Sequence, residues 1–236
     1  PYAFHTIGST IAVNALHYAK VRGFPRREAG EDFYLLNKLA KVGSVRQLDS
    51  GPECEPIGIA ARRSDRVPFG TGAAGGKIMK FDDPQRQFLL YHPAVFSLLG
   101  DWLRSFQPLW DSRECSPGSV LLSKRHRVLV GGLEEMGVGL ALRQALKQSS
   151  SPAQFRRQMH TWFDAFRTLK LIHFLRDRQW PSISLDKLLN SQDIDHLMEH
   201  EPGLAGLYST LRHQLYMPAD SSAGIINRPN EKSGNG

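Results

Sequence analysis

The stretch Trp162-Phe-Asp-Ala-Phe-Arg-Thr-Leu-Lys-Leu-Ile-His-Phe-Leu175 carries apolar side chains on most sides when it is wound as an α-helix. A helix that is apolar nearly all round is normally buried. We therefore expect one helix over residues 153–176 at the centre of the core, with Trp162, Phe163 and Phe166 among the core residues. Ser149-Ser-Ser-Pro152 marks its start, because proline is tolerated in the first turn of a helix.

The rest of the second half also has a helical pattern. Apolar residues recur at helical spacing over residues 94–106, 133–147 and 204–216, which predicts three further helices. We therefore expect residues 77–217 to form a mainly α-helical region. From Pro218 onward the composition turns to serine, asparagine, glycine, proline and charge, which predicts a disordered tail over residues 218–236.

Residues 1–76 are richer in glycine and in turn signals. The expected elements are two helices, over residues 11–22 and 31–42, and two short strands, over residues 44–48 and 57–61. The glycine-rich residues 68–76 predict a loop. This mixture of helices and strands favours an α/β region.

The charge of the chain is positive and spread out. The 236 residues include 30 Lys and Arg against 23 Asp and Glu, a formal net charge of +7. The cations are not gathered on one arm, so we expect no nucleic-acid partner, and we interpret the basic run Lys124-Arg-His-Arg127 as solvated surface. The cation excess favours an anionic ligand. Nucleic-acid binding through that excess is kept as the weakest alternative.

Cysteine content and hydropathy indicate the cellular setting. Cys54 and Cys115 are too few for a disulfide framework, which fits a reducing compartment. No apolar run approaches the ~20 residues of a membrane-spanning helix. We expect a cytoplasmic protein with no transmembrane segment in this chain, and peripheral membrane contact stays open. The chain begins at Pro1 with neither an initiator Met nor a signal segment, so we also expect an upstream part to be missing.

Three short motifs give the strongest indication of chemistry: Gly8-Ser-Thr-Ile-Ala-Val-Asn14, Val21-Arg-Gly-Phe-Pro25 and Ala29-Gly-Glu-Asp-Phe33. The third places Glu31 and Asp32 at the start of a predicted helix, where free N–H groups and the helix dipole keep carboxylates ionised. An ionised carboxylate beside a cleft suits a general base. Acids also stabilise helix starts, so the pair by itself favours a structural role.

The order of these motifs resembles the acceptor-side half of family 2 glycosyltransferases, which have the nucleotide-diphospho-sugar transferase (GT-A) fold. The resemblance rests on Ile11-Ala-Val-Asn14, Arg22-Gly-Phe-Pro25 and Gly30-Glu-Asp32, and it covers about the first third of the chain. It implies that residues 1–76 are the C-terminal half of a GT-A domain. The expected fold class is therefore a partial GT-A α/β fold followed by a mainly helical region.

The resemblance also implies an enzyme. The reaction would move a sugar from a nucleotide-diphospho-sugar donor to an unidentified acceptor hydroxyl, with inversion. Asp32 would be the catalytic base and Glu31 would orient the acceptor. The expected substrate-binding residues are Gly30, Asn14, His5, Arg63 and Arg66, the two arginines facing the diphosphate. Some members of the family carry a Gln-x-x-Arg-Trp segment near the leaving diphosphate. The corresponding stretch of this chain has neither the Gln nor the Trp, which argues against the processive polysaccharide synthases.

A divalent metal is part of the same expectation. Metal-dependent members hold Mn²⁺ or Mg²⁺ through an Asp-x-Asp motif upstream of the acceptor half. Asp193-Ile-Asp195 stands in the wrong order for that role. We therefore expect the metal ligands in residues absent from this chain, none within it, and a chain that is inactive by itself.

Other motifs are interpreted structurally. Gly70-Thr-Gly-Ala-Ala-Gly75 matches a dinucleotide-binding fingerprint, but residues 76–80 are a poor helix start and residues 91–98 hold no acid, so a flexible active-site loop is expected. His196-Leu-Met-Glu-His200 matches an inverted zinc-protease pattern without a suitable third ligand. The pairs His160/Asp164 and His173/Asp177 are expected to be helix-face pairs or buried histidines with hydrogen-bond partners.

A non-enzymatic alternative stays open. The chain would then be a non-catalytic helical interaction module with a remnant transferase-like domain that binds an anionic ligand. An Asp-x-Asp motif upstream would favour the enzyme over this module.

Overall fold

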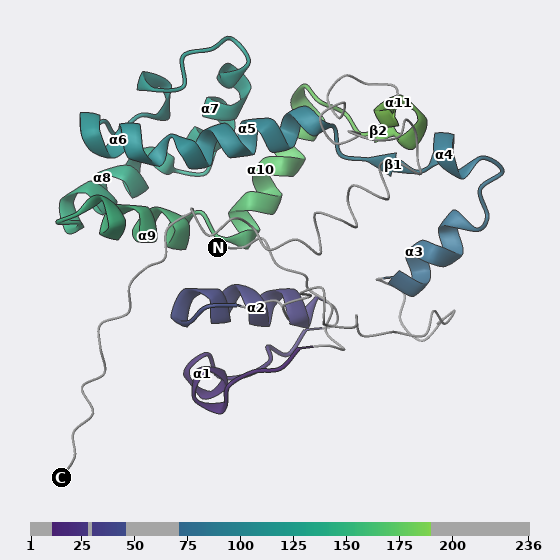
Figure 1. The fold of residues 1–236 in the computed structure, drawn as a ribbon, viewed down its shortest axis with the longest axis horizontal. Helices are drawn as coiled ribbons and strands as arrows, with labels where there is room; N and C mark the ends of the chain where they lie inside the picture. Colours follow the sequence, from purple (N-terminus) through teal and green to yellow (C-terminus); the bar gives the residue numbers. More distant parts are fainter. Residues whose placement is uncertain (1–10, 28–29, 46–70, 190–236) are drawn as a thin grey trace, which may run out of the picture. The chain divides into compact units, whose positions relative to one another are not determined.

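The computed structural model of the chain describes residues 11–27, 30–45 and 71–189. They belong to one of two compact units; the other, Leu48–Ala61 and Asp195–Gly236, lies outside the described residues. Figure 1 shows the described part as mainly helical. Its elements are α1 (Ala15–Lys20), α2 (Glu31–Val42), α3 (Thr71–Ile78), α4 (Pro84–Gln87), β1 (Leu89–Leu90), α5 (Pro93–Arg104), α6 (Phe106–Ser112), η2 (Pro117–Ser119), α7 (His126–Glu135), α8 (Val138–Gln148), α9 (Pro152–Trp162), α10 (Ala165–Arg178), β2 (Ile183–Ser184) and α11 (Leu185–Leu189).

The predicted partial GT-A α/β fold is wrong. The described residues are mostly helical, and the sheet they contain has two antiparallel strands, β1 and β2, both outside residues 1–76. A GT-A half instead needs several strands in a sheet covered by helices. Of the predicted strand over residues 44–48, Ser44 and Val45 are described and lie in no strand. The predicted strand over residues 57–61 lies outside the described residues.

The loop predicted for residues 68–76 is wrong over its described part. Residues 71–76 lie in helix α3, which crosses the predicted domain boundary at residue 76. Each glycine lowers helix stability by about 1 kcal/mol relative to alanine, a cost that neighbouring helix formers can offset. Two alanines stand within α3, and Lys77 lies in its last turn. The glycine content therefore overstated the preference for a loop.

Helices α1 and α2 pack through a small apolar cluster. Its buried residues are Val21, Leu35, Leu36 and Leu39. Lys38 Nζ also donates to the Val21 carbonyl at 2.8 Å, which satisfies a carbonyl at the end of α1. The bounds predicted for α2 and its end at Gly43 are confirmed. Helix α1 begins four residues later than predicted, because Asn14 caps it.

The main core lies among α5, α6, α7, α8, α9 and α10, which Figure 1 shows in teal and green. The Trp102 ring lies edge-on to Phe106 and to Phe163, with centroids 4.9 and 5.8 Å apart. Phe163 is 2% exposed and Trp162 packs against this core, as predicted. Phe166 instead contacts the rings of Phe33 and Tyr34 from α2. The core of the helical region is therefore built from six helices.

The helix predicted over residues 153–176 is two helices. Helix α9 begins with Pro152 in its first turn, as predicted, but it ends at Trp162. Phe163 has φ −84° and ψ 68°, outside the helical region, and Asp164 then caps α10 through the Arg167 N–H. The apolar pattern continues across the break because Phe163 and Ala165 are both buried. Hydrophobic periodicity alone therefore does not reveal the break between α9 and α10.

A glycine divides the helix predicted over residues 133–147. Gly137 has φ +80°, a left-handed conformation that costs a side chain roughly 1–2 kcal/mol. Helix α7 ends just before it and α8 begins just after it. Helix α5 matches the prediction over residues 94–106 to within two residues. The helix predicted over residues 204–216 and the tail over residues 218–236 lie outside the described residues.

Strand β1 precedes α5 and strand β2 follows α10, and the two strands pair as a short ribbon. Leu89 pairs with Ser184 and Leu90 with Ile183 in antiparallel register. Helices α4 and α11 contact this ribbon and each other. The chain thus enters α5 and leaves the region after α10 at the same ribbon.

Helices α7 and α10 approach each other at Gly132, which supplies a testable prediction. A Cβ there would lie 2.7 Å from Phe174 Cδ1 and 3.1 Å from Leu171 Cδ1, too close for packing without movement. Gly132→Ala should therefore lower the free energy of unfolding by about 1–3 kcal/mol, as measured by chemical denaturation.

Gly131 is the matched control, because it lies in the same helix and a Cβ there meets nothing within 4 Å. Gly131→Ala should be neutral or stabilising by up to about 1 kcal/mol. Equal effects of the two substitutions would contradict the close approach of α7 and α10 at Gly132.

Candidate functional site

The two predicted catalytic acids lie in the first turn of α2, where they were expected. Gly30 occupies the N-cap position of this helix, with φ 70° and ψ 19°, and it makes no side-chain hydrogen bond to the first turn. Asp32 Oδ1 accepts from the Phe33 N–H at 2.7 Å, and Glu31 is exposed. These contacts are local, as expected of acids that stabilise a helix start. The catalytic roles of Glu31 and Asp32 stay predictions.

The predicted substrate-binding residues are not brought together in the described part of the chain. Asn14 caps α1, since its Oδ1 accepts from the N–H groups of Leu16 at 3.0 Å and His17 at 3.4 Å. A capping amide of this kind needs no ligand to explain its position. His5, Arg63 and Arg66 lie outside the described residues, as do Asp193 and the segment from His196 to His200.

Asp164 is the centre of a buried polar cluster that sequence reasoning missed. Its Oδ2 accepts from Lys41 Nζ at 2.6 Å and from Asn37 Nδ2 at 3.4 Å. Asn37 Oδ1 accepts in return from the Ala165 N–H at 3.1 Å. Three separate donors, including the Arg167 N–H, thus satisfy one carboxylate that is 6% exposed. The cluster joins α2 to the start of α10.

The charge of Asp164 is stabilised by these contacts. Burial raises the pKa of the carboxyl, but hydrogen bonds from Lys41 and the Arg167 backbone, with the Lys41 charge, lower the pKa to below its usual value. The carboxylate is therefore ionised at neutral pH. With its hydrogen bonds all made within the protein, its role is structural.

The two described histidines that the sequence pairs with an aspartate, His160 and His173, have structural positions. His173 Nε2 lies 2.8 Å from the Tyr91 hydroxyl, so it is a partly buried histidine with a hydrogen-bond partner, as predicted. Asp177 pairs with the adjacent Arg176 at 2.6 Å. His160 lies edge-on to Phe106, and burial lowers its pKa to about 4, with a further effect of the Arg156 charge. His160 and Asp164 are not a helix-face pair, because α9 ends between them, and the buried His160 Nδ1 has no hydrogen-bond partner, so the prediction is wrong for His160.

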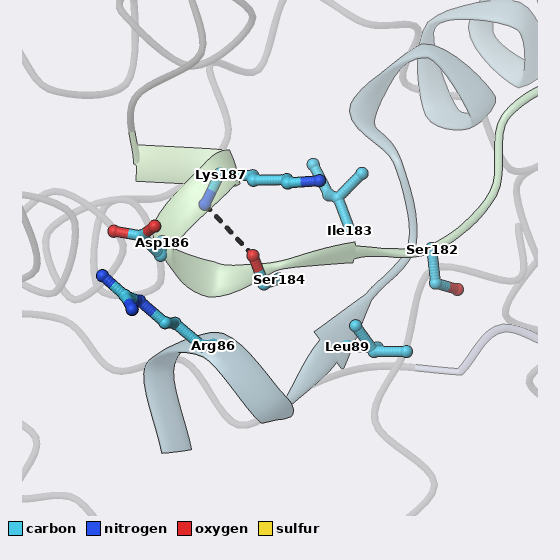
Figure 2. A pocket seen from close by; sticks show the side chains of 7 residues that line it. All are labelled: Arg86, Leu89, Ser182, Ile183, Ser184, Asp186 and Lys187. Carbon is cyan, nitrogen blue, oxygen red and sulfur yellow. Dashed lines mark hydrogen bonds between the residues drawn. The ribbon is translucent and has the colours of Figure 1, made fainter. Parts of the chain in front are cut away.

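A cavity of about 390 Å³ lies beside the β1–β2 ribbon. Its lining residues are Arg86, Leu89, Ser182, Ile183, Ser184, Asp186 and Lys187, shown in Figure 2. The Arg86 guanidinium lies on the Asp186 side, whereas the Lys187 side chain extends over Ile183. Ser184 Oγ accepts from the Lys187 N–H at 3.3 Å. The two cations do not converge on one point, so this arrangement defines no ligand.

A second charged cluster lies at the surface, where α5 meets the start of α7. Asp101 Oδ1 accepts from Arg104 Nη2 at 2.6 Å, while Asp101 Oδ2 accepts from Arg125 Nη2 at 2.6 Å and lies 3.0 Å from His126 Nε2. Two further exposed cations, Lys124 and Arg127, flank Arg125 and His126 in the sequence. We call the whole group the basic corner: Asp101, Arg104, Lys124, Arg125, His126 and Arg127.

The basic corner is exposed and fixed at the same time. The side chains of Arg104 and Arg125 are 72% and 56% exposed, although both bind Asp101, whose side chain is 14% exposed. Burial raises the pKa of the Asp101 carboxyl, but hydrogen bonds from His126 and Arg104 and the charge of Arg125 lower it overall. The prediction that residues 124–127 are solvated surface is confirmed for the exposed Lys124 and Arg127.

Comparisons with models of protein families, with curated proteins and with solved structures found no match to this chain. Within residues 11–27, 30–45 and 71–189, no helix is long and apolar enough to cross a membrane. In the same part of the chain, no three His, Cys, Asp or Glu side chains are grouped so that they could hold a metal ion. The Mn²⁺ or Mg²⁺ site expected in residues absent from this chain is not tested by this result.

The Asp164 cluster leads to a prediction about stability. Asp164→Ala removes the cap of α10 and the partner of Lys41, and it leaves the Asn37 amide without its acceptor. The expected loss is about 2–4 kcal/mol in the free energy of unfolding, measured by chemical denaturation. Asp164→Asn keeps a capping oxygen and should cost less than Asp164→Ala.

Asp83 provides the matched control, because it also caps a helix, α4, through the Arg86 N–H, but its side chain is 49% exposed. Asp83→Ala should cost about 1 kcal/mol or less. If Asp164→Ala cost no more than Asp83→Ala, the buried cluster would contribute nothing beyond an ordinary cap.

Proposed function

We propose that the helical region α5–α10 is an interaction module that binds an anionic partner through the basic corner. The observation that carries this proposal is the arrangement around Asp101, which holds Arg104 and Arg125 in place while both arginine side chains stay more than half exposed. This is the non-enzymatic alternative considered from the sequence, without the transferase-like domain.

The chemistry of the basic corner suits an anion with several charges. The basic corner contains one carboxylate, that of Asp101, and four basic side chains. These are Arg104, Lys124, Arg125 and Arg127. A guanidinium presents a planar set of donors to carboxylate or phosphate oxygens. Because Asp101 already orients two of the arginines, less side-chain freedom is lost when a partner binds.

A soluble polyanion provides the test of this proposal. Lys124→Gln/Arg127→Gln removes two exposed cations and leaves the arginines on Asp101 in place. Each cation near an anionic surface contributes about 1 kcal/mol, so the Kd for heparin, measured by calorimetry at low salt, should rise about 10- to 30-fold. Added salt should weaken binding of the unaltered protein.

Arg143 and Lys147 supply a matched control, since both are exposed on α8, outside the basic corner. Arg143→Gln/Lys147→Gln removes the same charge and should leave the Kd near that of the unaltered protein. If both double variants weakened binding equally, net charge would account for it and the proposal would be wrong.

Glycosyl transfer is a second candidate function, and we propose it on one observation: Glu31 and Asp32 lie in the first turn of α2, as the resemblance implies. The donor would be a nucleotide-diphospho-sugar, the acceptor a hydroxyl group, and a divalent metal would come with residues absent from this chain. The helical fold of the described residues gives this candidate no further support.

Asp32→Asn tests that candidate in a protein that contains this chain and transfers sugar. Removal of a general base should lower sugar transfer by about 100-fold or more, measured as release of nucleoside diphosphate, with donor binding nearly unchanged. Glu31→Gln, one residue away in the same turn, should have a smaller effect. A near-normal rate in Asp32→Asn would exclude Asp32 as the base.

A further inference from the structure

We propose that the anionic partner of the basic corner is the surface of a lipid bilayer, into which Leu122 inserts. This inference rests on the proposed function and names its partner. It starts from an apolar residue that no other part of the structure explains: the Leu122 side chain is 79% exposed, the largest exposure among the large apolar residues of the described part of the chain.

Leu122 is held outward by the residues on both sides of it. Leu121 is only 8% exposed and belongs to the main core, and its N–H donates to the Pro117 carbonyl at 2.9 Å. On the other side, the His126 N–H donates to the Ser123 carbonyl at 2.9 Å, which closes the turn that begins α7. With Leu121 buried and the turn closed, Leu122 points away from the core. The exposure is thus built into the fold.

The surroundings of Leu122 are basic. Lys124, Arg125 and Arg127 follow within five residues, and Arg125 shares Asp101 with Arg104. An apolar side chain with cations beside it suits the boundary between acyl chains and anionic headgroups. One inserted leucine would bind a bilayer only weakly, but several cations each add about 1 kcal/mol next to an anionic leaflet.

The same segment suits a protein partner less well. The core of a protein interface is a desolvated apolar patch with few charges. Leu122 instead precedes Ser123, Lys124 and Arg125, all exposed and hydrophilic. A fluid bilayer accepts an isolated apolar side chain without a shaped pocket, so the observations favour lipid.

Vesicle sedimentation with the full chain tests the inference. The probes are vesicles of phosphatidylcholine alone and vesicles of phosphatidylcholine with phosphatidylserine. The protein should bind the second kind and not the first. Leu122→Ser should weaken that binding about tenfold, and Leu122→Trp should bind at least as tightly as the unaltered protein, because tryptophan favours the interface. Substitution of so exposed a residue leaves the core intact.

The controls separate this inference from the proposed function. Leu140→Ser removes another exposed leucine, 58% exposed on α8, and should leave vesicle binding unchanged. Leu122→Ser should leave the Kd for heparin unchanged, because it removes no charge. If heparin binds but anionic vesicles do not, the bilayer is the wrong partner and the proposed function stands. If Leu122→Ser binds anionic vesicles as well as the unaltered protein does, Leu122 does not insert and the inference is wrong, while the proposed function again stands. If neither probe binds, both fail.

Discussion

Asp164 places a carboxylate inside the protein at the point where α9 ends and α10 begins, and Lys41 and Asn37 from α2 meet it there. An unpaired charge in such a position would cost several kcal/mol. The break in the helix and the contact with α2 therefore depend on each other. In a continuous helix the Arg167 N–H would bond to a backbone carbonyl instead of to Asp164. Without α2, the carboxylate would lose its cation.

The protein uses the same chemistry a second time with a different outcome. Asp101 also binds cations at 2.6 Å, but its arginines remain more than half exposed, whereas the Lys41 side chain opposite Asp164 is 33% exposed. A buried pair limits which arrangements of the helices are stable. An exposed pair contributes little to stability and mainly orients the groups that face solvent. The Asp164 cluster therefore stabilises the arrangement of the helices, and the Asp101 cluster orients side chains at the surface.

The sequence allowed the helical character of the second half to be predicted but not the breaks between its helices, and in the first third it allowed α2 to be located but not the fold class. Buried residues recur at helical spacing in α5, and glycine ends α2, so both could be located from local signals. The break at Phe163 depends on Lys41 and Asn37, more than 120 residues away, and no local pattern contains that information. Glycine content misled the prediction at α3, because composition alone does not fix backbone conformation. The GT-A resemblance rested on short motifs, of which Asn14 and Glu31 also serve as ordinary helix-start residues. The basic corner was noted only as a run of charges, since the sequence does not place Asp101 beside it.

The pairing of Leu89 with Ser184 brings the entrance and the exit of the helical region together. Paired residues of antiparallel strands have their Cα atoms only about 5 Å apart. The two ends of such a segment are about as close together as the two ends of a surface turn. The neighbouring ends therefore suit reopening of the chain elsewhere by circular permutation, whereas residues 89–184 moved alone would leave Asp164 without the cation that Lys41 of α2 supplies.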